Sequence, residues 1–196
     1  MALSETRIRL NNVRVAFPKF GAPESFPGGQ DPTKYWSASF ILPKDHPQIK
    51  QLQDLMLSLA IGKWGPKKGP QVLAAAKAIG KVFLRDGDAK AQHDGFEGNM
   101  FVSARAKEND QPDYRDGMRA VLTPAQAAKM IYGGCFANAI IECYAYTKGN
   151  NGLGAGLKGV QFRAKGDAFV GGPPPEDDDY EEIAAPEGEG EESIAD

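Results

Sequence analysis

The 196-residue chain separates its charges between two segments. Residues 171–196 hold eleven acidic side chains and neither lysine nor arginine. Residues 1–170 therefore carry 15 of the 26 acidic side chains against all 23 basic ones, a net charge of +8. So acidic a segment cannot bury enough apolar surface to fold. We expect one folded, basic domain over residues 1–170, followed by a disordered Pro/Gly linker and acidic tail over residues 171–196.

Within residues 1–170, short runs of alternating apolar and polar residues predict a domain built mainly of strands. We expect these strands at residues 6–17, 34–42, 82–84, 99–107, 134–147 and 157–163. The pair Asn11-Asn12 shifts the alternation of the first strand by one residue, which predicts a β-bulge. Residues 18–33 are rich in proline and glycine, which predicts a loop between the first two strands.

Apolar residues at helical spacing predict a few helices between the strands. The first is expected to be capped by Asp45 and to stop at Gly62, and a shorter one spans residues 71–79, with an irregular basic loop between them at residues 63–70. Thr123 is expected to cap a third, short helix. Strands and long helices do not alternate regularly, which argues against a doubly wound fold. The fold class predicted is β-rich α+β, specifically a small barrel with added helices.

The positive charge of residues 1–170 suggests a polyanionic partner. Proteins that bind single strands combine cations for the phosphates with aromatic rings on which the bases stack. In several places this sequence puts rings beside polar or charged residues. The candidate DNA-binding residues are Lys34, Tyr35, Lys63, Trp64, Lys67, Lys68, Phe101, Arg105, Tyr144 and Tyr146. For Trp64, packing against the helix that it follows is an equal alternative.

Two other motifs suggest different chemistry. Asp86, Asp88, His93 and Asp94 lie within nine residues and could hold a divalent metal ion for a phosphodiesterase, although Asp-Gly pairs are also common in turns. Residues 154–159 match GxGxxG, but a strand rather than a helix follows, so we interpret them as a glycine-rich hairpin turn. A virion or scaffolding protein whose charges serve assembly is a third alternative.

Several short blocks follow one another in a characteristic order: NVRVAFPKF, KYWSASFILPKDHPQIKQLQ, RDGDAK, GFEGNMFVSARAK, QPDYRD, IYGGCFANAIIECYAY and GLKGVQF. Together they resemble phage-encoded single-stranded-DNA-binding proteins, a group first described as a domain of unknown function. The resemblance covers roughly residues 7–169. It implies an OB-fold with added helices and non-sequence-specific binding of single strands in phage replication or recombination, in the cytoplasm of an infected bacterium. We expect no enzymatic activity, no catalytic residues, no cofactor and no bound metal.

The end of the chain suggests a second resemblance. Bacterial single-strand binders also end in an acidic segment, whose tip docks on replication and repair proteins. The corresponding partner-binding residues here would be Glu191, Glu192, Ile194 and Asp196, without the terminal Pro-Phe of the bacterial proteins. Because tethering holds the tail at a high effective concentration, we also expect it to compete with DNA for the basic domain. A tail that only confers solubility is the alternative.

Overall fold

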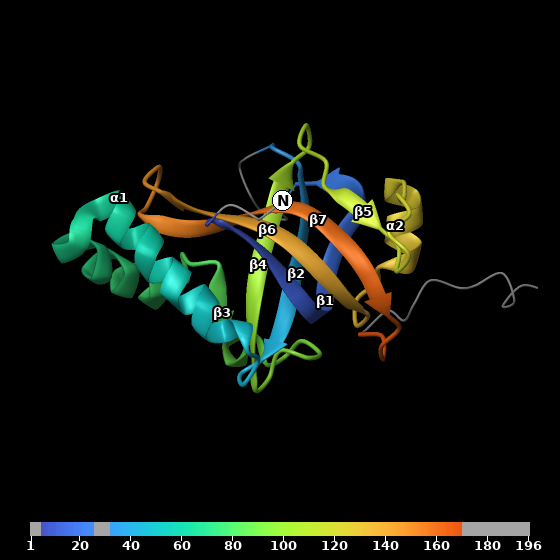
Figure 1. Ribbon diagram of the computed structural model, residues 1–196, viewed down its shortest axis with the longest axis horizontal. Helices are drawn as coiled ribbons and strands as arrows, with labels where there is room; N and C mark the ends of the chain where they lie inside the picture. The colour runs from blue at the N-terminus through green and yellow to red at the C-terminus, as the bar shows by residue number, and fades with distance from the viewer. Residues whose placement is uncertain (1–4, 26–31, 170–196) are drawn as a thin grey trace, which may run out of the picture.

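A five-stranded barrel forms the centre of the molecule, with one helical element at each end (Figure 1). The computed structural model describes residues 5–25 and 32–169. The barrel strands are β1 (Arg7–Glu24), β2 (Tyr35–Pro43), β4 (Asn99–Lys107), β6 (Phe136–Tyr146) and β7 (Gly152–Ala164). Hydrogen-bonded neighbours follow in the order β4-β2-β1-β6-β7, and β7 returns to β4 in parallel where Arg105 pairs with Gly156. This closed order is an OB-fold, which confirms the predicted fold class.

Alternation along the strands decides which side chains fill the barrel. In β7, Leu153, Ala155 and Leu157 are buried in the main core, while the residues between them face outwards. In β1 the register with β6 shifts between Leu10 and Val13, so both of these side chains still point into the core. The predicted β-bulge at Asn11-Asn12 is therefore confirmed.

Two strands are longer than predicted, and one short strand was not predicted at all. β1 continues to Glu24 instead of ending at residue 17, so the loop predicted at residues 18–33 is wrong for residues 18–24. Register shifts on either side of Lys19 let β1 keep pairing with β2 despite Pro18. β7 begins at Gly152, so residues 152–156 belong to a strand and are not a turn. The short strand β5 (Asp113–Arg115) pairs in parallel with β7, along the edge of β7 opposite β6. The predicted boundary at residue 170 lies outside the described residues.

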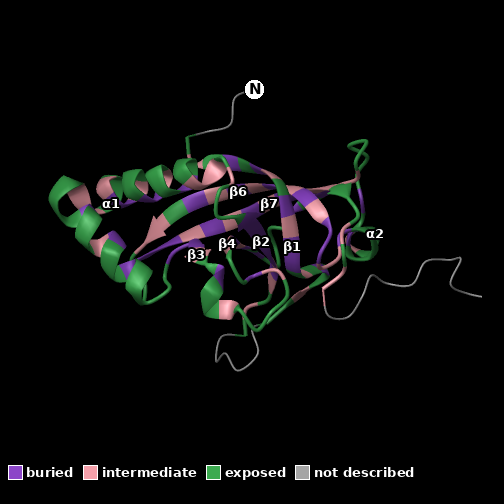
Figure 2. Ribbon diagram, turned by 90° about the horizontal axis from the view of Figure 1, so that it is seen from below, coloured by how far each residue is buried: buried purple, intermediate pink, exposed green. Residues whose placement is uncertain are grey.

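The first helical region is one folded-back pair of helices rather than two helices joined by a loop. α1 (Gln48–Ala78) is helical on both sides of Gly65, whose φ of 85° breaks the helix. The predicted irregular loop at residues 63–70 is therefore wrong, and so is the cap at Asp45, since Pro47 precedes the helix and no side chain caps it. Most of α1 is exposed in Figure 2. No helix of the described ranges is long and apolar enough to cross a membrane.

The second helix, α2 (Pro124–Met130), lies against β1 at the other end of the barrel (Figure 1). The Thr123 hydroxyl accepts from the backbone N–H of Gln126, and the Gln126 side chain accepts in return from the Thr123 N–H. This reciprocal capping satisfies two backbone donors that would otherwise lack partners at the start of the helix. The predicted cap at Thr123 is confirmed. Ala127 faces inwards and is fully buried.

The two halves of α1 touch at Gly69, which gives a first test of the fold. A Cβ atom added at Gly69 would lie 2.8 Å from backbone atoms of Ala60 and Ile61, whereas one added at Gly62 would meet nothing within 4 Å. We expect Gly69→Ala to reduce the free energy of unfolding by about 1–3 kcal/mol through overpacking. Gly62→Ala is the matched control and should raise it by up to about 1 kcal/mol. Equal effects in urea unfolding would contradict the close packing at Gly69.

Candidate nucleic-acid interface

The outward face of β2 and β4 brings polar and charged side chains together. In the register of this pair, Ser39 lies opposite Ser103, and Ser37 lies opposite Arg105. These four side chains face outwards because the intervening residues, such as Ala104, are buried in the main core. In OB-folds, the face formed by the second and third barrel strands is the one that binds oligonucleotides.

A hollow of about 390 Å³, here called the basic groove, lies over this face. Four cations line it, namely Lys81, Arg85 of β3 (Leu84–Asp86), Lys90 of the short 3-10 helix η1 (Gly87–Lys90), and Arg105 of β4. Three aromatic rings line it as well, those of Phe17, Tyr144 and Tyr146. Within the described ranges, its lining contains no aspartate or glutamate. The groove therefore offers positive charge and ring faces in one place.

The two tyrosines depend on glycines in the neighbouring strand. Tyr144 pairs with Gly154 and Tyr146 pairs with Gly152 across β6 and β7. A Cβ atom at Gly154 would lie 2.6 Å from the Tyr144 ring, and one at Gly152 would lie 2.5 Å from the Tyr146 hydroxyl oxygen. The phenol rings thus lie over the bare backbone of β7. This explains part of the GxGxxG match: its first glycine makes room for a ring in a strand, so the predicted hairpin turn is wrong.

Arg85 and Lys90 share one ring at the end of the basic groove. The Arg85 guanidinium lies 4.7 Å from the centroid of the Phe101 ring, and the Lys90 ammonium lies 5.2 Å from the same centroid. Arg85 donates from Nη2 to the Ser103 hydroxyl at 2.7 Å. Burial lowers the pKa of both cations, and the charge of Arg85 lowers the pKa of Lys90 further. Two positive charges are thus held close together and partly out of water.

Three of the predicted DNA-binding residues, Arg105, Tyr144 and Tyr146, line the basic groove together. Tyr35 extends this row, since the Arg105 guanidinium lies 4.8 Å from the centroid of its ring. Lys34 is exposed just before β2, and its carbonyl accepts a hydrogen bond from the Glu108 N–H. The contact of these residues with DNA stays a prediction.

Phe101 is correctly assigned to the outward face of β4 but wrongly predicted to offer its ring to a base. The ring is only 1% exposed because Ala16, Ile41, Phe96 and Phe169 pack over it in a second, smaller core. Alternation of residue types reports which face a side chain occupies, but not whether a later segment covers that face. Phe101 therefore supports the two cations above it instead of stacking on a ligand.

The basic segment in α1 is divided between several surroundings. Trp64 is partly buried and packs against the main core, so it is a packing residue, although the expected packing partner was the helix that it follows. Lys63 lines a larger hollow of about 920 Å³, here called the mixed-charge groove, which adjoins the basic groove at Arg105 and Tyr144. Lys67 and Lys68 are exposed on the second half of α1 and line neither groove. The structure does not gather these residues into one site.

Lys81, Arg85, Lys90 and Phe17 were missed as candidates. Arg85 and Lys90 stand in the segment RDGDAK, whose aspartates drew attention to a metal site instead. To predict that both cations lie beside Phe101, one would have to know that β3 pairs with β4, because this pairing places Arg85 opposite Phe101. The predicted partner-binding residues Glu191, Glu192, Ile194 and Asp196 lie outside the described residues.

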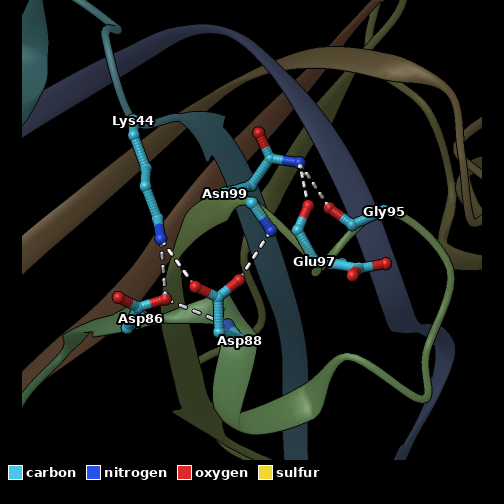
Figure 3. Close-up of polar contacts among 7 residues, drawn as sticks. Lys44, Asp86, Asp88, Gly95, Glu97 and Asn99 are labelled. Atoms are coloured by element: carbon cyan, nitrogen blue, oxygen red, sulfur yellow. Dashed lines mark hydrogen bonds and ion pairs between the residues drawn. The ribbon is translucent and has the colours of Figure 1, made fainter.

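The predicted metal cluster does not form a site. The Lys44 ammonium lies between two of its carboxylates, 2.7 Å from Asp88 Oδ2 and 3.4 Å from Asp86 Oδ1 (Figure 3). Asp86 also caps η1, and the His93 ring packs against Phe17 with a centroid separation of 5.0 Å. Within the described ranges, no three His, Cys, Asp or Glu side chains converge as metal ligands would. The aspartates thus stabilise a loop, which agrees with the interpretation of the Asp-Gly pairs as turn residues.

Comparisons with known proteins identify the family of this chain. The model of the family described as "Enterobacter phage Enc34, ssDNA-binding protein" matches residues 6–190. Protein p50 of Acyrthosiphon pisum secondary endosymbiont phage 1 is 36% identical over 185 residues, which are 93% of this chain and 97% of that protein.

Solved structures give the same picture of the fold. The single-stranded-DNA-binding protein of bacteriophage Enc34, in complex with ssDNA, superposes with a TM-score of 0.70 at 24% identity, over 84% of this chain and 90% of that one. The single-stranded DNA binding protein gp2.5 of bacteriophage T7 superposes with a TM-score of 0.56 at 11% identity, over 93% and 100% of the two chains. At these identities the two likenesses show the fold.

The loop that carries the aspartates gives a pH prediction. Hydrogen bonds from Lys44 and from the Gly98 N–H hold the pKa of Asp88 below its usual value. A lowered pKa in the folded state stabilises the protein above the unfolded pKa, and this contribution is lost as the pH falls through the folded value. Asp88→Asn should therefore lower the thermal midpoint at pH 7, and the gap to wild type should close below about pH 4.

The control for this experiment is Asp54→Asn, which removes an exposed helical ion pair with Lys50. Such pairs contribute little, so the thermal midpoint should barely change. A gap for Asp88→Asn that persists unchanged at pH 2 would show that the carboxylate charge of Asp88 is not what stabilises the loop.

Proposed function

Because the chain belongs to the family of the Enterobacter phage Enc34 ssDNA-binding protein, we propose that it is a non-enzymatic protein that binds single-stranded DNA without sequence preference. The observation that carries this proposal is the basic groove. Its four cations, its three rings and the absence of acidic side chains from its described lining suit a phosphate backbone with unpaired bases.

Each component of the groove has a separate part in binding. Lysine and arginine release the counterions condensed on the phosphates, which supplies affinity that does not depend on sequence. Tyr144 and Tyr146 offer ring faces, and every base can stack on a ring face once it is unpaired. Bases in a duplex are already stacked and paired, so these rings favour single strands. The protein would coat exposed single strands and melt hairpins by mass action.

We place this activity in phage DNA replication or recombination, inside an infected bacterial cell. The acidic tail would have two parts there: it would regulate access to the groove, and its tip around Ile194 would recruit other replication or recombination proteins. The groove lining is positive, so the tail and the DNA would compete for the same cations. Screening confines such competition to about 10 Å between exposed charges at 0.1 M salt.

The place where the tail begins supports this regulation. Phe169 is packed in the second core beside Phe96 and Phe101, and its N–H donates to the Gly133 carbonyl. Lys90 of the basic groove lies over the same Phe96 and Phe101 rings. The first tail carboxylate, Glu176, follows Phe169 by seven residues, a reach of up to about 25 Å. The tail's carboxylates can therefore reach the cations of the groove.

The first test measures single-strand binding and its dependence on salt. If the groove holds three or four phosphates, log Kobs should fall against log[salt] with a slope between about −2 and −3, at about 0.7 per phosphate. Tyr144→Ala should weaken binding by about 1–3 kcal/mol, because a stacked base loses its ring. Fluorescence anisotropy with an oligothymidylate measures both quantities, and duplex DNA and RNA of equal length test the preference.

Tyr144→Phe is the matched control, since it keeps the ring and removes only the hydroxyl, and its affinity should stay near that of the wild type. Lys129→Gln, in α2 at the far end of the barrel, should also leave binding unchanged. Equal affinity of Tyr144→Ala and wild type would contradict stacking on this ring. A salt slope near zero would contradict the basic groove as the contact surface.

The second test removes the tail after Val170. Truncation should tighten single-strand binding, and more so at low salt, because competing carboxylates are lost and screening weakens their effect as salt rises. The thermal midpoint should stay nearly unchanged, since Phe169 and the second core are retained. Recruitment of a partner that reads the tip around Ile194 should be abolished. Identical DNA affinity at every salt concentration would contradict competition by the tail.

A further inference from the structure

We propose that Arg85 and Lys90 form a fixed subsite for a single phosphodiester group, seated above the Phe101 ring at the end of the basic groove. This inference rests on the proposed binding of single-stranded DNA and adds a defined place where the backbone is held. Positive charges elsewhere in a groove can follow a mobile strand. A subsite of this kind would fix the position of one phosphate, and with it the neighbouring bases.

The first step of the argument is geometric. Both cations lie close to the buried ring of Phe101, with Arg85 at 4.7 Å and Lys90 at 5.2 Å from its centroid. They come from elements that follow directly on each other, β3 and η1, and both elements are held against β4. The Ser103 hydroxyl accepts a hydrogen bond from Arg85 Nη2 at 2.7 Å and itself lies 3.3 Å from the Ser39 hydroxyl. These contacts fix the position of the Arg85 guanidinium.

The second step concerns hydrogen bonding. Arg85 Nε is buried and has no hydrogen-bond partner within the described part of the chain. A buried donor without a partner is costly, and a charged one more so. Arginine presents its donors as a planar fork that suits the oxygens of a phosphate. Because Arg85 lines the basic groove, a phosphate there is a partner toward which the guanidinium could turn its Nε.

The third step concerns charge. Neither Arg85 nor Lys90 forms an ion pair in residues 5–25 and 32–169, whereas Lys44, Lys50 and Lys158 each do. The pKa of Lys90 is lowered by burial and by the neighbouring Arg85, so the two cations oppose each other in the free protein. An anion between them would remove this repulsion. Sites that bind ligands often carry such strain in their free state.

The neighbouring rings favour a phosphodiester of single-stranded DNA over a small anion. Burial lowers the pKa of Arg85 and the nearby Tyr146 partly offsets this, while the centroid of the Phe17 ring lies 5.8 Å from the Lys90 ammonium. Both rings line the same groove. A phosphate held by the two cations would therefore have the rings of Tyr146 and Phe17 in the same groove, where the bases of neighbouring nucleotides could stack.

The test counts phosphates by means of the salt dependence. If the two cations hold the same phosphate, the double variant Arg85→Gln/Lys90→Gln should lose about 0.7 from the salt slope, the value for one phosphate. It should also bind an oligothymidylate roughly 10-fold or more weakly at 0.1 M salt. A slope loss near zero would overturn the proposal, because the pair would not touch the backbone. A loss near 1.4 would overturn it too, because each cation would then hold its own phosphate.

Two controls keep the outcome interpretable. Lys129→Gln removes an exposed lysine of α2 and should change neither slope nor affinity. Lys90→Gln alone should leave the thermal midpoint equal to or above that of the wild type, because it removes a partly buried charge beside Arg85. A clear loss of thermal stability in this variant would contradict the repulsion on which the argument depends.

A separate measurement distinguishes this subsite from the proposed function. Inorganic phosphate should raise the thermal midpoint of the wild type more than that of the double variant, since a ligand stabilises the state that binds it. Sodium chloride at matched ionic strength corrects for screening. If the wild type shows this difference but does not bind single strands, the anion subsite stands and the proposed function fails. If it binds single strands but phosphate acts equally on both proteins, the subsite fails.

Discussion

The closure of the barrel between β4 and β7 is the constraint on which the site depends. The two strands meet in parallel where Arg105 pairs with Gly156. On the inner side of β7, Leu153 and Leu157 fill the core, and on the outer side glycines leave the backbone bare. β7 can therefore close the barrel and also leave room for rings of β6, because the Tyr144 ring lies where a side chain at Gly154 would be. Glycine in a strand weakens it, so its use here has a packing reason.

The outward face of β2 and β4 is divided into a covered half and an open half. Ile41 and Phe101 are covered by Phe96 and Phe169 in the second core, whereas Ser103 and Arg105 line the groove. The boundary between the halves is where Arg85 and Lys90 lie. A buried ring below and a groove above partly remove these cations from water while leaving them open to a ligand. The small second core thus supports the site besides adding stability.

Strand alternation allowed much of the fold to be predicted, while contacts between distant segments could not be. The predicted strand at 99–107 agrees with β4, and Thr123 caps α2 because both signals depend on residues close in sequence. The loop predicted at residues 63–70 was wrong, because glycine and proline were taken to end the helix, whereas the break at Gly65 lets the chain fold back and continue as a helix. The prediction for Phe101 was wrong for a different reason, since Ala16, Ile41 and Phe169, which help to cover it, lie 85, 60 and 68 positions away in the sequence.

The cations of the candidate site likewise could not be identified from the sequence alone. A net charge of +8 in residues 1–170 pointed to a polyanion without saying which cations would meet it. Several of them are neutralised locally, as in the pairs Lys44–Asp88, Lys50–Asp54, Arg115–Asp113 and Lys158–Asp110. Lys81, Arg85 and Lys90 form no such pair within the described ranges, and all three line the basic groove. The number of phosphates that the protein can hold therefore follows from how the fold distributes its carboxylates, which net charge does not report.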